Sequence, residues 1–249
     1  MSLTYLEIDQ ERSDYFDVPD RVRDDFEDRL LRSWLYHEHA LDGVVLDGND
    51  IERALSGQPC RNYCDGLTQR SLRYMSACID HIRDESRKGT ELSIEFIRDL
   101  HVRMCDDDEE VAGRYRQRDT SPGVYNLDIV GQNSISYHFH KFIETYHGEL
   151  KKYHPIRTAA MAHWEFMRVF PYDERSGFVG RLMMNFILAK NFYPPAIIHA
   201  NDRQAYFDAL NGHRTDMVPV LAEGIRCSII GARTFTQKFN ETRTRRAAF

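Results

Sequence analysis

The sequence predicts an all-α protein in which one β-hairpin or extended flap is inserted into a helical body, and three observations support this. Apolar residues recur at spacings of three and four along most of the 249 residues, which is the period of an amphipathic helix. Only residues 121–137 break that period, where apolar and polar residues alternate between turn residues, as they do in a strand. No polar stretch is long enough to act as a linker, so we expect one continuous body.

Six apolar stripes define the expected helices, in chain order: residues 26–34, 75–82, 97–104, 159–170, 179–187 and 217–229. Pro171 disfavours helical backbone at Phe170 and so ends the fourth helix. Pro219 is tolerated only if it lies in the first turn of the last helix. The expected hairpin spans residues 124–130, between the third helix and the fourth.

Composition and charge limit the classes of function. A chain with 42% hydrophobic and 29% charged residues is typical of a soluble globular protein. A net charge of −6 argues against a general nucleic-acid binder, and no apolar run is long enough to span a membrane. The N-terminal residues are acidic, whereas a secretory leader would be basic and apolar. The number of cysteines, five, is odd, which favours free thiols over a set of disulfides. We therefore expect a cytoplasmic protein with reduced thiols.

The loop between the fourth and fifth expected helices has the frame of a phosphate-binding site. Gly177 and Gly180 open a helix whose N-terminal N–H groups and dipole favour an anion. Glu174 is a candidate ligand for a Mg²⁺ ion that bridges phosphate oxygens, and Arg181 is a candidate contact to the anion. The same residues also fit a tight helix–loop–helix whose glycines serve only packing, and both interpretations stand.

The segment from Phe170 to Arg181 resembles the signature loop of the Fic/Doc (Fido) family, His-Pro-Phe-x-Asp/Glu-Gly-Asn-Gly-Arg-x-x-Arg. Pro171, Glu174 and Gly177 match it, as does the final arginine. Ordered matches on both sides extend the resemblance over roughly residues 30–232, and they include His154-Pro155-Ile156, Gly113-Arg114-Tyr115-Arg116 and Tyr193-Pro194-Pro195.

The resemblance implies the Fic fold, a helical bundle with a β-hairpin flap. It divides the chain into an N-terminal helical segment at 1–65, a Fic-like domain at 66–232, and a helix end and tail at 233–249. The implied ligand loop consists of Glu174, Arg175, Ser176, Gly177, Gly180 and Arg181.

Five residues depart from the signature, and the mildest departure is Tyr172 in place of its phenylalanine. Phe170 stands at the histidine that acts as the base in the family's AMP transfer, and Phe178 stands at the first arginine. Loss of a positioned base costs about 10²–10⁴ in rate, and loss of an electrostatic donor costs on the order of 10²–10³. Arg175 replaces a glycine and Ser176 replaces an asparagine. AMP transfer is therefore not expected.

The catalytic base and the inhibitory helix of the family both have candidate counterparts in this sequence. His138 and His140 would face one side of an extended strand, and they are the candidate replacement base. In the family, an inhibitory helix with Ser/Thr-x-x-x-Glu-Gly pairs its glutamate with the last signature arginine. Glu38, Asp42 and Gly43 occupy the corresponding positions, so we expect Asp42 to contact that arginine.

The expected flap offers a route to partners. Val124, Leu127 and Ile129 are the candidate residues for docking an extended target segment as an added strand. A hairpin that is simply packed onto the body is the alternative.

The first hypothesis is a catalytically degenerate pseudo-transferase that binds a protein partner or a nucleotide-like small molecule. One alternative is a divergent transferase that moves phosphate, phosphocholine, a sugar or another nucleotide with a replacement base. Another is a non-enzymatic, antitoxin-like regulator. The sequence assigns no definite cofactor, and Mg²⁺ with a nucleotide is the candidate, with Glu174 as the metal ligand. A homodimer is a further expectation, whereas nucleic acid and membrane are not expected partners.

Overall fold

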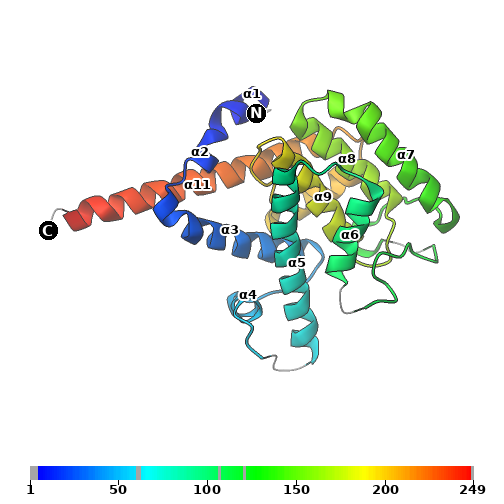
Figure 1. The fold of residues 1–249 in the computed structure, drawn as a ribbon, viewed down its shortest axis with the longest axis horizontal. Helices are drawn as coiled ribbons and strands as arrows, with labels where there is room; N and C mark the ends of the chain where they lie inside the picture. Colours follow the sequence, from blue (N-terminus) through cyan, green and yellow to red (C-terminus); the bar gives the residue numbers. More distant parts are fainter. Residues whose placement is uncertain (1–4, 60–62, 106–107, 120–121, 248–249) are drawn as a thin grey trace.

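The computed structural model describes residues 5–59, 63–105, 108–119 and 122–247. Within these ranges all regular structure is helical, and none of the helices is both long enough and apolar enough to cross a membrane. The α-helices are α1 Tyr5–Glu11, α2 Ser13–Phe16, α3 Asp20–Leu41, α4 Gly48–Leu55, α5 Tyr63–Lys88, α6 Ile94–Met104, α7 Ile135–Gly148, α8 Pro155–Val169, α9 Ser176–Lys190, α10 Arg203–Asn211 and α11 Met217–Ala247 (Figure 1). Short 3-10 turns lie at Gly123–Tyr125, Gln132–Ser134, Leu150–Lys152 and Ala200–Asp202.

Helix α9 forms the centre of the body. Every residue from Ser176 to Leu188 is buried, as expected for a helix that is apolar on most sides. Helices α8, α5 and α6 pack around it. A Cβ atom on Gly180 would lie 3.0 Å from Phe166 of α8, so this glycine lets α8 and α9 approach closely. The α8–α9 loop, residues 170–175, is therefore held between two helices whose positions are fixed by core packing.

Helix α11 is the long C-terminal helix that its apolar stripe predicts, and Pro219 lies within its first turn. Helices α1, α2, α8 and α10 pack against it. Figure 1 shows α1 and α2 on one side of α11 and α3 on the other, with the C-terminal end projecting from the body. Arg233 of α11 donates to Asp14 at 2.8 Å, and this contact ties the two ends of the chain together.

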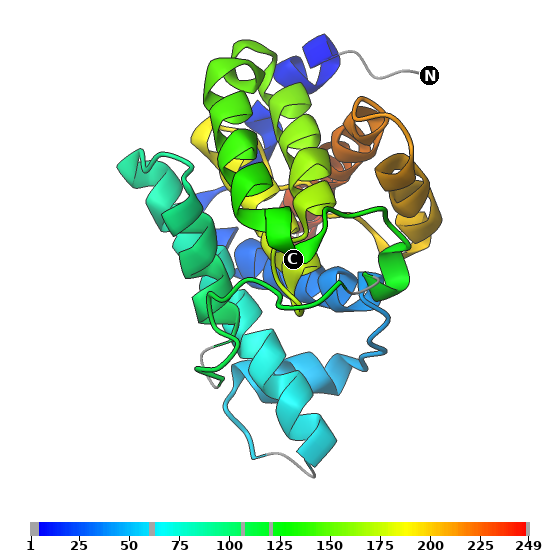
Figure 2. The ribbon, with the colours of Figure 1, turned by 90° about the vertical axis from the view of Figure 1, so that its right-hand side faces the viewer.

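No strand is present in the described part of the segment for which a β-hairpin or extended flap was predicted, residues 122–137. Figure 2 shows this segment as an open path across one face of the molecule. The Val130 N–H donates to the Arg168 carbonyl at 3.0 Å, and the Arg116 guanidinium donates to the Val130 carbonyl. Asn126 turns the chain with φ 46°. Because the end of α8 and Arg116 take the hydrogen bonds of a strand partner, no second strand pairs there.

Candidate functional site

Two non-glycine residues with positive φ bound the α8–α9 loop. Phe170 caps α8 at φ 42°, and Arg175 precedes α9 at φ 61°. This left-handed backbone conformation costs about 1–2 kcal/mol in a residue that has a Cβ atom. Phe170 is 5% exposed, and its ring centroid lies 6.1 Å from that of Tyr125. An aromatic ring therefore fills the first position of the loop, and it can accept no proton.

Three side chains fix the loop through hydrogen bonds to its backbone. Arg116 Nε donates at 2.9 Å to the carbonyl that ends α8. Ser176 Oγ accepts from the Tyr172 N–H at 3.0 Å, and His101 Nε2 donates to the Glu174 carbonyl at 3.2 Å. Burial lowers the pKa of His101 to about 4, so its ring is neutral at neutral pH. The substituted residue Ser176 thus has a structural role inside the loop.

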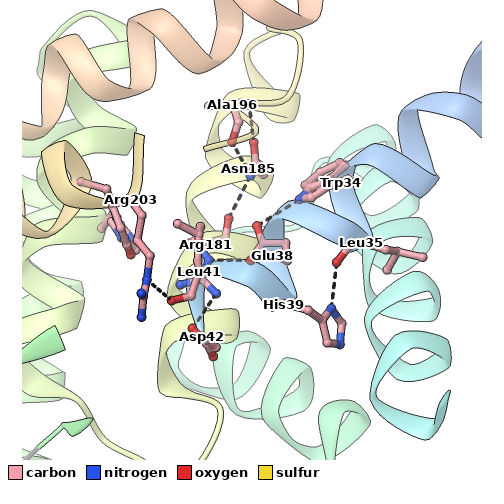
Figure 3. A network of polar contacts seen from close by, with 12 residues as sticks. Trp34, Leu35, Glu38, His39, Leu41, Asp42, Arg181, Asn185, Ala196 and Arg203 are labelled. Carbon is pink, nitrogen blue, oxygen red and sulfur yellow. Dashed lines mark hydrogen bonds and ion pairs between the residues drawn. The ribbon is translucent and has the colours of Figure 1, made fainter. Parts of the chain in front are cut away.

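Arg181 is fully buried in the second turn of α9, and each of its three guanidinium nitrogens has a partner. Nε donates to Glu38 at 2.5 Å, and Nη2 donates to Asp42 at 3.2 Å (Figure 3). Nη1 donates to the Tyr125 hydroxyl at 2.7 Å, and that hydroxyl donates to Asp42. Burial alone lowers the pKa of Arg181, but Glu38, Tyr125 and Asp42 raise it well above its ordinary value. The guanidinium is therefore charged, and each of its three nitrogens has a partner.

The acidic residues of this cluster come from the end of α3. The predicted Asp42–Arg181 contact is present, at 3.2 Å, and Gly43 turns the chain away with φ 85°. The shorter ion pair is made by Glu38, which lies one helical turn earlier and is 2% exposed. Trp34 Nε1 donates to the same carboxylate at 3.1 Å. The sequence pattern did not predict the Glu38–Arg181 pair.

Tyr125, from the segment between α6 and α7, fills the space in front of α9. A Cβ atom on Gly177 would lie 1.9 Å from the Tyr125 hydroxyl oxygen, so Gly177 is needed to admit this phenol. Burial raises the pKa of Tyr125 well above its ordinary value, which keeps the hydroxyl protonated. No spacing rule singled out Tyr125; the one available signal is an aromatic residue two positions after Gly123.

The two large substitutions in the loop also pack against protein groups. Arg175 Nη1 donates to Ser71 of α5 at 2.8 Å, and the same hydroxyl lies 3.0 Å from His39 Nε2. The Phe178 ring centroid lies 5.2 Å from that of His39 and 5.3 Å from Arg181 Cζ. Arg175 is thus directed at α5, and Phe178 covers the buried arginine.

A pocket of about 410 Å³ opens beside the loop, and its walls include Asp42, Arg118, Asp173 and Glu174. The Nε atom of Arg118 lies 3.8 Å from the Oδ1 atom of Asp173. Among the described residues, no three His, Cys, Asp or Glu side chains gather in a way that could hold a metal ion. The Tyr125 phenol fills the space in front of Gly177, and Arg181 already binds three partners, so a ligand that contacts either of them must displace these groups.

The structure places the candidate replacement bases on a helix and not on a strand. His138 and His140 lie in α7, where residues two positions apart point in different directions. His140 is exposed, with its Nδ1 2.7 Å from the Ser136 carbonyl. Neither histidine is among the residues that line the pocket beside the loop.

The candidate docking residues are divided between surface and core. Val124 is 41% exposed, Leu127 is 6% exposed, and Ile129 is half-buried. A groove of about 750 Å³ follows residues 126–131 and is bounded by Asp119 and Asn211. The segment therefore offers a mostly polar groove together with one exposed apolar side chain.

Comparison with known proteins gives one consistent family. Residues 91–188 match the Fic/DOC family. Curated relatives include "Protein adenylyltransferase Fic" of Aedes aegypti, which is 25% identical over 189 residues, covering 70% of this chain and 36% of the relative. The protein of the same name from Nematostella vectensis is 25% identical over 206 residues, covering 78% of this chain and 46% of the relative. The chain thus spans less than half the length of these relatives.

Solved structures share the fold. A Fic domain containing signaling protein from Bacteroides thetaiotaomicron aligns with a TM-score of 0.78 at 18% identity, covering 92% of this chain and 95% of the other. Fic-1 from C. elegans aligns with a TM-score of 0.78 at 19% identity, covering 95% of this chain and 72% of the other. With the signature-like loop and the all-α body, these matches show that the chain has the all-α Fic fold and that its residues 91–188 are similar to the Fic/DOC family.

Proposed function

We propose that this chain is a Fic-fold protein that transfers no AMP and acts by binding a protein partner. The observation that carries the proposal is the state of Arg181, whose three nitrogens are bound to Glu38, Asp42 and Tyr125. In the family this arginine is the last of the signature, and here each of its nitrogens already has a protein partner, with which a phosphate would have to compete.

The energetic cost of freeing Arg181 is large. Removing one partner from a buried ion pair costs about 3–5 kcal/mol, because Glu38 would remain as an uncompensated buried charge. A nucleotide that had to displace these contacts would bind roughly a hundredfold to several thousandfold more weakly. The missing imidazole at Phe170 and the missing arginine at Phe178 act in the same direction, although such losses need not multiply.

An assay of AMP transfer tests the first half of the proposal. The chain is incubated with Mg²⁺ and ATP, and covalent AMP is sought by intact-mass measurement on the chain itself and on added protein substrates. We expect no adduct. The comparator carries Phe170→His, Arg175→Gly, Ser176→Asn and Phe178→Arg, and it shows whether the scaffold supports transfer. Steady turnover by the unaltered chain would refute the proposal.

The second half concerns the partner, and the groove along residues 126–131 supports it. Its polar walls suit an extended peptide, and Asn126 and Asp128 are exposed along it. A photo-crosslinking residue placed at Asp128, which is exposed and lines this groove, should capture the same protein segment reproducibly. The matched control is the same residue at Tyr137, which is 65% exposed on α7. Equal capture at both positions would count against the groove.

A second candidate function is the transfer of another group with a carboxylate as base. The pocket of about 410 Å³ favours it, because Asp173 and Glu174 both line that pocket. Thermal-shift measurements against ATP, ADP, CDP-choline and nucleotide-sugars, with and without Mg²⁺, test this candidate. Stabilisation that is lost on Glu174→Gln would support it, and no shift with any compound would exclude these ligands.

A further inference from the structure

A cavity of about 520 Å³ lies between α10, α11 and the chain that leads into α10. We call it the α10–α11 cavity, and its apolar walls consist of Ile197, Ile198, Ala209, Pro219, Val220 and Gly224. This volume is typical of a small-molecule site, for which about 300–1,000 Å³ is usual. None of these residues lines the pocket beside the α8–α9 loop, so a ligand in this cavity is independent of the proposed function.

Close backbone packing fixes the floor of the cavity. A Cβ atom on Gly224 would lie 3.1 Å from the Ile197 carbonyl oxygen, so the absence of a side chain lets the chain at 196–198 lie directly on α11. Ser228 Oγ of α11 donates to the Pro195 carbonyl at 2.7 Å, and Ile197 is 3% exposed. The cavity is therefore preformed, and a ligand does not have to order its floor.

Two aspartates line the end of the cavity next to the α10–α11 turn. A Cβ atom on Gly212 in this turn would overlap Asp216 Oδ2 and lie 3.3 Å from the Asp208 carbonyl oxygen. The Asp208 carboxylate accepts from the neutral Gln204 amide at 2.8 Å, one helical turn back along α10, and Asp216 accepts from the His213 N–H at 2.8 Å. Neither aspartate has a salt bridge among the described residues, so their charge is not neutralised there.

Two more acidic side chains, Asp202 and Glu223, line the opposite end. Burial raises the pKa of the Cys227 thiol there, and the charges of Glu223 and Asp202 raise it further, so both carboxylates lie close to this sulfur. Arg226 donates to Glu223 at 2.9 Å and offsets its charge, whereas Asp202 has no salt bridge within the described part of the chain. No described wall residue is a lysine or an arginine. The apolar centre therefore lies between two acidic ends.

We propose that the α10–α11 cavity binds a linear polyamine. The ammonium groups bind the aspartates, and the methylene chain lies on the apolar floor, as the stem of a lysine side chain does on apolar surface. Position 223 lies seven residues after position 216, which places the two ends roughly 10 Å apart at the rise of an α-helix. An extended triamine such as spermidine spans a comparable length, and its three charges match the three aspartates that lack a basic partner.

Two other kinds of cation fit the cavity less well. Among the described residues, no three His, Cys, Asp or Glu side chains gather in a way that could hold a metal ion, so a compact cation lacks a set of ligands. A basic peptide brings main-chain amides that need hydrogen-bond partners, but the backbone groups of α10 and α11 are engaged within their helices. A free polyamine has no carbonyl groups to satisfy, and its N–H groups belong to ammonium groups that the aspartates can bind.

Isothermal titration calorimetry with spermidine at low salt tests the site. The double variant Asp202→Asn with Asp216→Asn keeps an acceptor for the His213 N–H and removes one carboxylate from each end, so it should weaken binding about tenfold. The control Glu109→Gln with Glu110→Gln removes the same charge at exposed positions outside the cavity and should leave the affinity unchanged. Equal weakening in both variants would mean that spermidine responds only to the net negative charge, and this result would overturn the proposal.

The length of the ligand and a blocked cavity supply further readouts. Diaminooctane should bind more tightly than putrescine, because both have two ammonium groups and only the longer one reaches both ends. Ala205→Trp, at an exposed position that lines the cavity, should weaken spermidine binding at least about tenfold without lowering Tm, whereas Asn201→Trp, at an exposed position outside it, should not.

Three results would contradict the proposal. The first is the absence of saturable spermidine binding up to about 1 mM. The second is binding that Ala205→Trp leaves intact, which would place the ligand elsewhere on the surface. The third is tighter binding of trilysine than of spermidine, which would make a basic peptide the occupant.

Discussion

Replacing Arg181 by methionine should destabilise the protein strongly. Methionine has a similar volume, so little packing is lost. Glu38 is 2% exposed, and without the guanidinium its charge stays buried with only Trp34 as a hydrogen-bond donor. Breaking a buried pair in this way costs about 3–5 kcal/mol. For a chain of this size that loss lowers Tm by roughly 6–20 °C.

Urea unfolding followed by circular dichroism measures the free energy, and a double-mutant cycle isolates the pair. Glu38→Leu combined with Arg181→Met should be no less stable than Arg181→Met alone, because the uncompensated charge is gone. The coupling energy should then be at least about 2 kcal/mol. The control Arg87→Met removes an exposed ion pair at 3.1 Å and should cost less than about 1 kcal/mol. A similarly small cost for Arg181→Met, with no coupling to Glu38, would show that the guanidinium is solvated and free to bind anions.

Three further predictions concern the surroundings of Arg181. Gly177→Ala should destabilise the chain by displacing Tyr125, whose hydroxyl oxygen lies 1.9 Å from the added Cβ, and Tyr125→Ala should largely remove that penalty; chemical denaturation of the four proteins checks this. Arg175→Gly should be more stable than Arg175→Ala by about 1 kcal/mol, because both lose the bond to α5 and only glycine relieves the positive φ; a higher or equal stability of the alanine variant would contradict this. Burial lowers the pKa of His101 to about 4 and that of His163 to about 3, from 6.5. Below pH 6.5 the unfolded chain therefore binds protons that the fold excludes, so stability is complete above pH 6.5 and falls on acidification, by roughly 2 kcal/mol per histidine at pH 5. The pH dependence of the unfolding free energy should flatten in His163→Gln, and an unchanged slope would refute this assignment.

The helices of the body could be predicted from the sequence because each has a local signal. The stripe at 179–187 lies in α9, and Pro171 ends α8 at Val169 as expected. The structure of residues 124–130 could not be predicted correctly. Alternating apolar and polar residues indicate an extended chain, but they do not indicate which groups form hydrogen bonds with it. The hydrogen bonds are made with the end of α8 and with Arg116. The spacing of residues within 124–130 predicts neither partner.

The candidate site was predictable only where a resemblance supplied the pairing. Asp42 was expected beside Arg181 for that reason, whereas the closer pair with Glu38 joins residues 143 positions apart and has no local signal. Tyr125 was missed because it also lacks a local signal: the packing of the segment between α6 and α7 positions its hydroxyl. His138 and His140 were given an extended backbone, and α7 begins at Ile135 instead.

The most direct test of the account is isothermal titration calorimetry of the unaltered chain with ATP and Mg²⁺. If Arg181 is held by Glu38, Asp42 and Tyr125, no saturable binding should appear up to concentrations of about 1 mM. A dissociation constant in the low micromolar range, lost on Arg181→Met in a variant shown to remain folded, would contradict the claim that this arginine is closed to phosphate.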